Sequence, residues 1–182
     1  IPPILREAVI SAEDKDFFNH GGVDPMGIAR AAYRDLKGEG VRQGGSTITQ
    51  QYVKQTYLTS EQTATRKLKE AVMAVKLEQQ ISKEEILTRY LNTAYFGRGA
   101  YGVQAASRAW FGHDIAGLDA GEAAFLAGLL RSPNGADPYA GPKSLKEAER
   151  RRKVVLDRMV VEGYVTPKEE KLLLAVPMNP MD

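Results

Sequence analysis

The sequence has no cysteine, which excludes disulfides, cysteine-ligated metal sites and thiol nucleophiles. It has only two histidines, His20 and His113, and neither has a partner histidine or cysteine at metal-ligand spacing. We therefore expect no histidine-based metal centre and assign His113 no role.

An excess of one charge is also lacking, because 25 basic residues face 23 acidic ones and leave a net charge of +2. A nucleic-acid partner is not expected from this balance, so any anion binding must be local. The sequence as given has no run of about 18 apolar residues and no signal peptide, and a membrane anchor would have to lie outside it.

What is present is the composition of a folded domain: 182 residues, of which 43% are hydrophobic and 26% charged. Apolar residues recur at helical spacing, and no segment predicts a strand. Capping pairs mark several helix starts, among them Thr59 with Gln62, Asp119 with Glu122, and Thr166 with Glu169. We expect about eight helices, over residues 4–14, 25–37, 47–58, 60–80, 83–94, 123–130, 144–162 and from 167 on, with a further short helix near residue 105.

The first segment with candidate catalytic residues runs from Glu13 to His20, at the end of the first helix. Phe17 and Phe18 need burial, which would draw the neighbouring carboxylates toward an apolar wall, where a glutamate suits proton transfer near neutral pH. The alternative is a solvated helix end.

The second segment, residues 44–51, lacks the Gly-Lys-Ser/Thr ending of a nucleotide phosphate loop. If Thr47 starts a helix, then Thr47, Gln51 and Lys54 share one face beside its N-terminus, a plausible seat for an anion. The alternative is a Gly-Gly turn before an ordinary polar helix.

In the third segment, Arg66, Lys67 and Glu70 share one side of a helix whose stretch 71–77 is largely apolar. Such a helix is expected to be central, where charges must pair or serve a ligand. The alternative is a solvent-edge ion pair. The basic run 149–153 is expected on a solvated helix face.

Taken together, five blocks resemble the peptidoglycan glycosyltransferase family, the polymerase domain of class A penicillin-binding proteins and of monofunctional transglycosylases. The blocks are Glu13-Asp14-x-x-Phe17-x-x-His20-x-Gly22, Gly44-Gly45-Ser46-Thr47-Ile48-Thr49-Gln50-Gln51, Arg66-Lys67-x-x-Glu70, Lys83-x-x-Ile86-Leu87-x-x-Tyr90-Leu91-Asn92 and Arg151-x-x-x-Val155-Leu156-x-x-Met159.

The resemblance implies an all-α fold with a lysozyme-like large helical lobe and a smaller, membrane-proximal jaw lobe. Residues 1–182 would be a single glycosyltransferase domain. Residues of about 23–45 would form a mobile jaw or loop region, and 163–182 would begin a linker toward a transpeptidase domain.

The resemblance also implies that the domain polymerises lipid II into β-1,4 glycan strands, with inversion and release of undecaprenyl pyrophosphate. Glu13 would be the general base, and Glu70 a second catalytic residue that orients the reacting groups or assists at the pyrophosphate. The substrate-binding residues would be Asp14, Phe17, His20, Thr47, Gln51, Lys54, Arg66 and Lys67.

No cofactor is implied as a requirement, although family members are often stimulated by a divalent cation such as Mg²⁺ or Mn²⁺. The implied partners are lipid II, the growing glycan strand, the membrane surface and other cell-wall synthesis proteins, at the extracytoplasmic face of the bacterial cell membrane. Two alternatives stay open: a lysozyme-like glycan-cleaving enzyme, and a non-catalytic glycan- or lipid-binding module. A hydrolase has no need of clustered cations.

Overall fold

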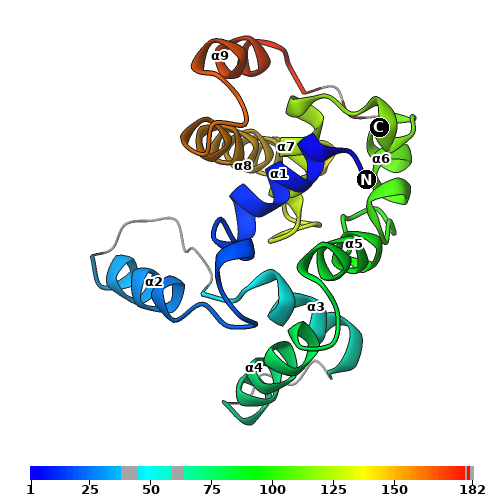
Figure 1. Cartoon of the computed structure of the whole chain (residues 1–182). Coiled ribbons are helices and arrows are strands. Elements are labelled where there is room, and N and C mark those ends of the chain that lie inside the picture. The colour runs from blue at the N-terminus through cyan, green and yellow to red at the C-terminus, as the bar shows by residue number, and fades with distance from the viewer. Residues whose placement is uncertain (38–44, 59–63, 179, 181–182) are drawn as a thin grey trace. The chain divides into compact units, whose positions relative to one another are not determined.

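The computed structural model describes residues 1–37, 45–58, 64–178 and 180. Its α-helices are α1 (Pro3–Glu13), α2 (Pro25–Lys37), α3 (Ile48–Tyr57), α4 (Ala64–Glu78), α5 (Lys83–Thr93), α6 (Val103–Phe111), α7 (Ala120–Leu129), α8 (Pro142–Val161) and α9 (Pro167–Ala175) (Figure 1). An isolated bridge between Tyr95 and Tyr101 is the only β pairing in the described segments, so the all-α prediction is confirmed. None of the described helices is long and apolar enough to cross a bilayer.

Side-chain caps fix several helix starts where the sequence predicts them. Asp119 and Thr166 each accept a hydrogen bond from the backbone N–H three residues later, and the acidic residue at that position bonds back. The same reciprocal box at the start of α3 joins Thr47 to Gln50. The box expected at Thr59 falls on residues outside the described ones.

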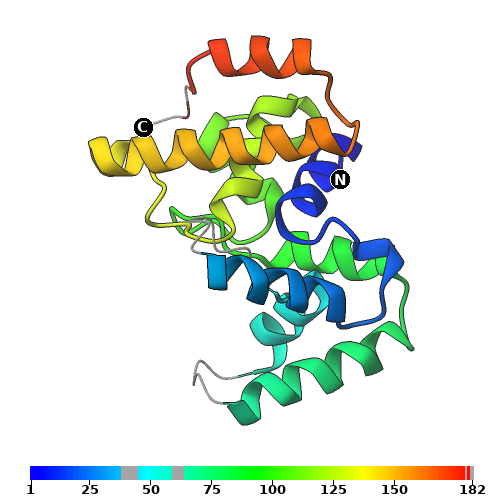
Figure 2. The same cartoon turned by 90° about the vertical axis from the view of Figure 1, so that its left-hand side faces the viewer.

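The chain divides into two compact units, residues 1–12 with 91–182 and residues 13–90. In the first unit, α7 and α8 lie side by side and α9 lies alongside α8 (Figure 2). The buried Trp110 and Phe125 meet edge to face, with ring centroids 5.1 Å apart.

In the second unit, α3 packs against α4, and every residue predicted for the functional site belongs to this unit. The predicted jaw or loop region of 23–45 contains α2. Residues 38–44 of this region lie outside the described residues.

The prediction that α4 is central in the protein is wrong. The side of α4 that carries its apolar stripe is exposed: Leu68 is 67%, Val72 47% and Val75 43% accessible to solvent. The helix instead buries Glu70 and Ala74, because that side of α4 faces the rest of the unit. Its apolar residues Leu68, Val72 and Val75 therefore lie on the surface.

Two further burial predictions need correction. Phe17 is fully buried, but Phe18 is 47% exposed because only one of two consecutive rings enters the core here. Arg152, expected on a solvated face, is buried because its guanidinium donates hydrogen bonds to the backbone carbonyls of Gly121, Leu173 and Val176.

Candidate functional site

Glu13 is the last residue of α1, and its side chain is buried. The carboxylate oxygen Oε2 accepts a hydrogen bond from Nε2 of Gln51 over 2.9 Å. The amide oxygen of Gln51 in turn accepts a hydrogen bond from the Tyr90 hydroxyl, also over 2.9 Å. Because both ends of the amide are engaged, Gln51 presents an N–H to the carboxylate in a fixed orientation.

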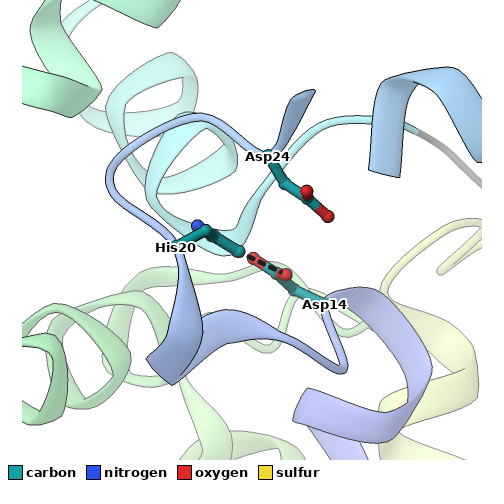
Figure 3. A group of neighbouring side chains, drawn as sticks. All are labelled: Asp14, His20 and Asp24. Atoms are coloured by element: carbon teal, nitrogen blue, oxygen red, sulfur yellow. Dashed lines mark hydrogen bonds and ion pairs between the residues drawn. The ribbon is translucent and has the colours of Figure 1, made fainter. Parts of the chain in front are cut away.

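Asp14 is a hub that joins the first two sequence blocks. Its Oδ2 accepts the backbone N–H of Ile48 at the first turn of α3, and its Oδ1 lies 2.8 Å from Nε2 of His20 (Figure 3). The buried ring of Phe17 packs edge to face against His20. These three predicted residues therefore hold the turn after α1 against α3.

The pKa of His20 is raised above its ordinary value of 6.5. Burial by itself lowers the pKa, and Lys83 also lowers it, but the hydrogen bond and the negative charge of Asp14 outweigh both. His20 and Asp14 therefore favour a charged pair.

Within the described part of the chain, Asp14, His20 and Asp24 are spaced so that they could hold a metal ion, since one ligand atom from each lies within 4.8 Å of the others (Figure 3). Their partners do not fit such a site. Both oxygens of Asp14 already accept hydrogen bonds, and Asp24 pairs with Arg30 at 3.1 Å.

Thr47 is buried, and its hydroxyl serves the fold. It donates to the backbone carbonyl of Gly22 over 2.8 Å and accepts the N–H of Gln50. The structure thus places this predicted substrate ligand at a helix cap on the wall of a pocket.

Glu70 on α4 gathers two of the predicted cations. Its buried carboxylate lies 3.0 Å from Nε of Arg66 and 2.8 Å from Nζ of Lys67. The Lys67 ammonium also donates to the Ser46 hydroxyl over 2.6 Å. Glu70 therefore holds both cations, and Lys67 also contacts the loop that precedes α3.

One pocket of this unit is lined by both Glu13 and Ser46. Since Ser46 also contacts Lys67, the pocket connects the buried carboxylate of Glu13 with the cations on α4. The lining residues are Glu13, Asp14, Lys15, Asp24, Gly27, Arg30, Gly45, Ser46 and Thr47. Lys54 lies on the exposed side of α3, one turn after the residue that contacts Glu13.

Sequence reasoning gave no role to Ser46 or Arg30. Ser46 stands inside the second block, where its contact with Lys67 spans 21 residues and leaves no local signal. Arg30 projects from α2 and pairs with Asp16 and Asp24 at 2.9 and 3.1 Å. Only the fold brings this cation to the pocket.

The geometry supplies the parts for transfer chemistry on an anionic substrate. A buried, oriented carboxylate can accept a proton, and preorganised cations can stabilise negative charge that develops on a leaving group.

The chain is similar to known proteins over most of its length. Penicillin-binding protein 1A of Streptococcus oralis is 43% identical over 182 residues, which cover 98% of this chain and 28% of that protein. Penicillin-binding protein 1A of Aquifex aeolicus is 42% identical over 179 residues, 98% of this chain and 24% of that protein. This chain thus spans about a quarter of the length of these relatives.

The crystal structure of penicillin-binding protein 1A from Haemophilus influenzae aligns with 74% of this chain and 16% of its own chain. The identity is 27% and the TM-score 0.47. The family model described as Transglycosylase matches residues 1–160. With its relatives above 40% identity and this match over most of its length, the chain belongs to the transglycosylase family.

Proposed function

We propose that this domain is a peptidoglycan glycosyltransferase that polymerises lipid II into β-1,4 glycan strands and releases undecaprenyl pyrophosphate. One observation carries the proposal: a buried glutamate, Glu13, shares a pocket with Ser46, which accepts a hydrogen bond from Lys67. Lys67 and a second cation, Arg66, both pair with Glu70. A base beside clustered cations suits the transfer of a sugar from a pyrophosphate donor.

In the proposed step, Glu13 accepts the proton of the 4-hydroxyl of the acceptor N-acetylglucosamine. The freed oxygen forms a bond to the anomeric carbon of the growing strand's terminal N-acetylmuramic acid. The bond from that carbon to the lipid pyrophosphate breaks with its electron pair, and the configuration inverts from α to β. Gln51 keeps the carboxylate of Glu13 oriented through its 2.9 Å hydrogen bond.

The departing pyrophosphate gains negative charge, which Lys54, Arg66 and Lys67 would stabilise more strongly in the transition state than in the ground state. Glu70 then acts by holding Arg66 and Lys67 in place, as its two ion pairs support. Asp14, Phe17 and His20 would shape the substrate site by fixing the turn after α1.

We also propose that the second unit contacts a membrane surface, where the lipid tail of the substrate lies. The exposed residues Leu68, Val72 and Val75 recur at helical spacing on α4, with the exposed lysines Lys69 and Lys76 nearby. Apolar residues beside lysines suit the boundary between acyl chains and anionic headgroups. The domain would act at the extracytoplasmic face of the bacterial cell membrane, with other cell-wall synthesis proteins as partners.

The proposed reaction needs no resident cofactor. Stimulation by Mg²⁺ or Mn²⁺ would come from ions that accompany the substrate pyrophosphate, because Asp14 already binds His20 and Ile48, and Asp24 already pairs with Arg30. Rates measured with EDTA and with each added cation test this point.

The decisive experiment incubates the protein with lipid II in detergent or in a bilayer and resolves the products on a gel. We expect long glycan strands from the wild type and none from Glu13→Gln, which keeps the size of the side chain. Glu7→Gln, on the same helix, is the matched control and should retain activity. Wild-type rate in Glu13→Gln would refute the assignment of the base.

The same assay separates the two alternatives. Release of short sugars from finished glycan, with no polymer from lipid II, would identify a glycan-cleaving enzyme. Binding of lipid II without turnover would identify a non-catalytic module.

A further inference from the structure

Glu78, the last residue of α4, has no part in the proposed chemistry, yet its nearly buried carboxylate accepts three hydrogen bonds. Its Oε2 accepts the backbone N–H of Gly22 over 2.6 Å. Its Oε1 accepts the hydroxyl of Thr49 over 2.5 Å and the ammonium of Lys83 over 2.8 Å. One side chain thus ties together α4, α3, the start of α5 and the end of the first sequence block.

Gly22 contacts α4, Glu78 and Thr47. A Cβ built on it would lie 2.5 Å from the backbone carbon of Ala74 and the backbone nitrogen of Val75, so the turn rests directly on the backbone of α4. Glu78, one turn farther along α4, holds the N–H of Gly22, and Thr47 holds its C=O over 2.8 Å. The peptide units around Gly22 therefore have little freedom to move.

Two paths lead from this junction to the proposed base. Thr47 caps α3, whose first N–H, that of Ile48, binds Asp14 next to Glu13. Gln51, one turn into α3, donates to Glu13 itself. Any shift of α3 relative to the Gly22 turn would change both contacts.

We propose that Glu78 is a positioning residue, which sets the place of Glu13 by clamping the Gly22 turn and α3 to the end of α4. Glu78 does not line the pocket that contains Glu13. Its effect therefore runs through Gly22 and Thr49 to α3. The kinetic part of this inference rests on the proposed function, whereas the structural part does not.

The test compares Glu78→Gln and Glu78→Asp with the wild type. Gln keeps the length and removes the charge, whereas Asp keeps the charge and is one methylene too short to reach all three donors. Thr49→Val removes a single tie and leaves the carboxylate intact. Glu85→Gln is the matched control, since Glu85 is an exposed glutamate on α5 paired with Arg89.

In lipid II polymerisation by the purified, folded protein, we expect Glu78→Gln and Glu78→Asp to lower kcat by about tenfold to a hundredfold, with KM changed by less than about twofold. Thr49→Val should lower kcat less, and Glu85→Gln should leave both constants unchanged. A lower melting temperature with unchanged kcat would show a merely structural role and overturn the proposal. Full activity in Glu78→Asp would overturn it as well.

A second readout needs no activity. The chain has two histidines, so NMR resolves the titration of each ring. If the clamp positions Asp14, the pKa of His20 should fall toward 6.5 in Glu78→Asp, where the charge beside Lys83 is kept. The titration of His113, in the other unit, should not move. The same His20 pKa in Glu78→Asp and in the wild type would overturn the clamp. A shifted His20 pKa in Glu78→Asp, together with a wild type that does not polymerise lipid II, would overturn only the proposed function.

Discussion

The amide of Gln51 bridges Glu13 and Tyr90, with 2.9 Å on either side. The donor end faces the carboxylate because the acceptor end is occupied by the Tyr90 hydroxyl. A tyrosine of α5 thus determines which end of the amide meets the proposed base, through a residue of α3.

The first prediction concerns this bridge. A hydrogen bond to a charged group contributes about 1.5–3 kcal/mol, so Gln51→Leu should lower kcat by about tenfold to a hundredfold. Tyr90→Phe should have a smaller effect. Because Tyr90 acts through Gln51, the double variant should be no slower than Gln51→Leu alone.

The measurement is steady-state polymerisation of lipid II, with Gln55→Leu as the control on the exposed part of the same helix. Independent, multiplying effects of the two substitutions would contradict the bridge.

The second prediction concerns pH and His20. The Asp14 charge and hydrogen bond raise the pKa of His20 above 6.5 in the fold despite its burial, so protonation of His20 favours the folded state. This stabilisation is fully present below the ordinary value of 6.5 and is lost as pH rises through the higher, folded value. The free energy of unfolding should therefore fall across that interval.

Urea unfolding at a series of pH values measures this slope. His113 also has a raised pKa, from its hydrogen bonds to Asp114 and Glu122, and contributes in the same direction. His20→Gln should remove most of the slope and His113→Gln little of it, because the side chain of His113 is 39% exposed and that of His20 only 9%. The reverse order would contradict the Asp14–His20 pair.

The third prediction uses two adjacent glycines. Gly22→Ala places a methyl group 2.5 Å from the backbone of α4, which cannot move aside as a flexible side chain could. We expect a loss of about 1–3 kcal/mol in the free energy of unfolding. Gly21→Ala meets nothing within 4 Å and should change it by less than about 0.5 kcal/mol. Equal effects in chemical denaturation would disprove the close packing of Gly22 on α4.

The fourth prediction tests the buried Arg152. Burial lowers its pKa, against the opposing charges of Asp119 and Glu149. Arg152→Met leaves three carbonyls, two of them near the end of α9, without their donor, at a cost of about 1–3 kcal/mol.

Arg150→Met is the matched control, because this arginine is exposed on the same helix and pairs only with Glu147 in the described contacts. It should cost less than about 0.5 kcal/mol in urea unfolding. A comparable loss in both variants would show that the contacts of Arg152 with α7 and α9 add no stability.

Local chemistry made much of the fold predictable. Residues three apart form the caps at Asp119 and Thr166, so the starts of α7 and α9 follow from the sequence. The end of α1 at Glu13 follows from helical spacing in the same way. The order of five blocks was sufficient to place the chain in its family.

The sequence by itself thus determined the helical class, the approximate positions of most helices and the candidate base and cations. Only the tertiary structure decided which of these side chains meet. The bonds of Gln51 to Glu13 and of Glu78 to Gly22 span 38 and 56 residues, and the periodicity of one helix carries no information about the helix packed against it. For the same reason Arg152 is buried and the apolar stripe of α4 is exposed: burial depends on neighbours that the local sequence does not specify.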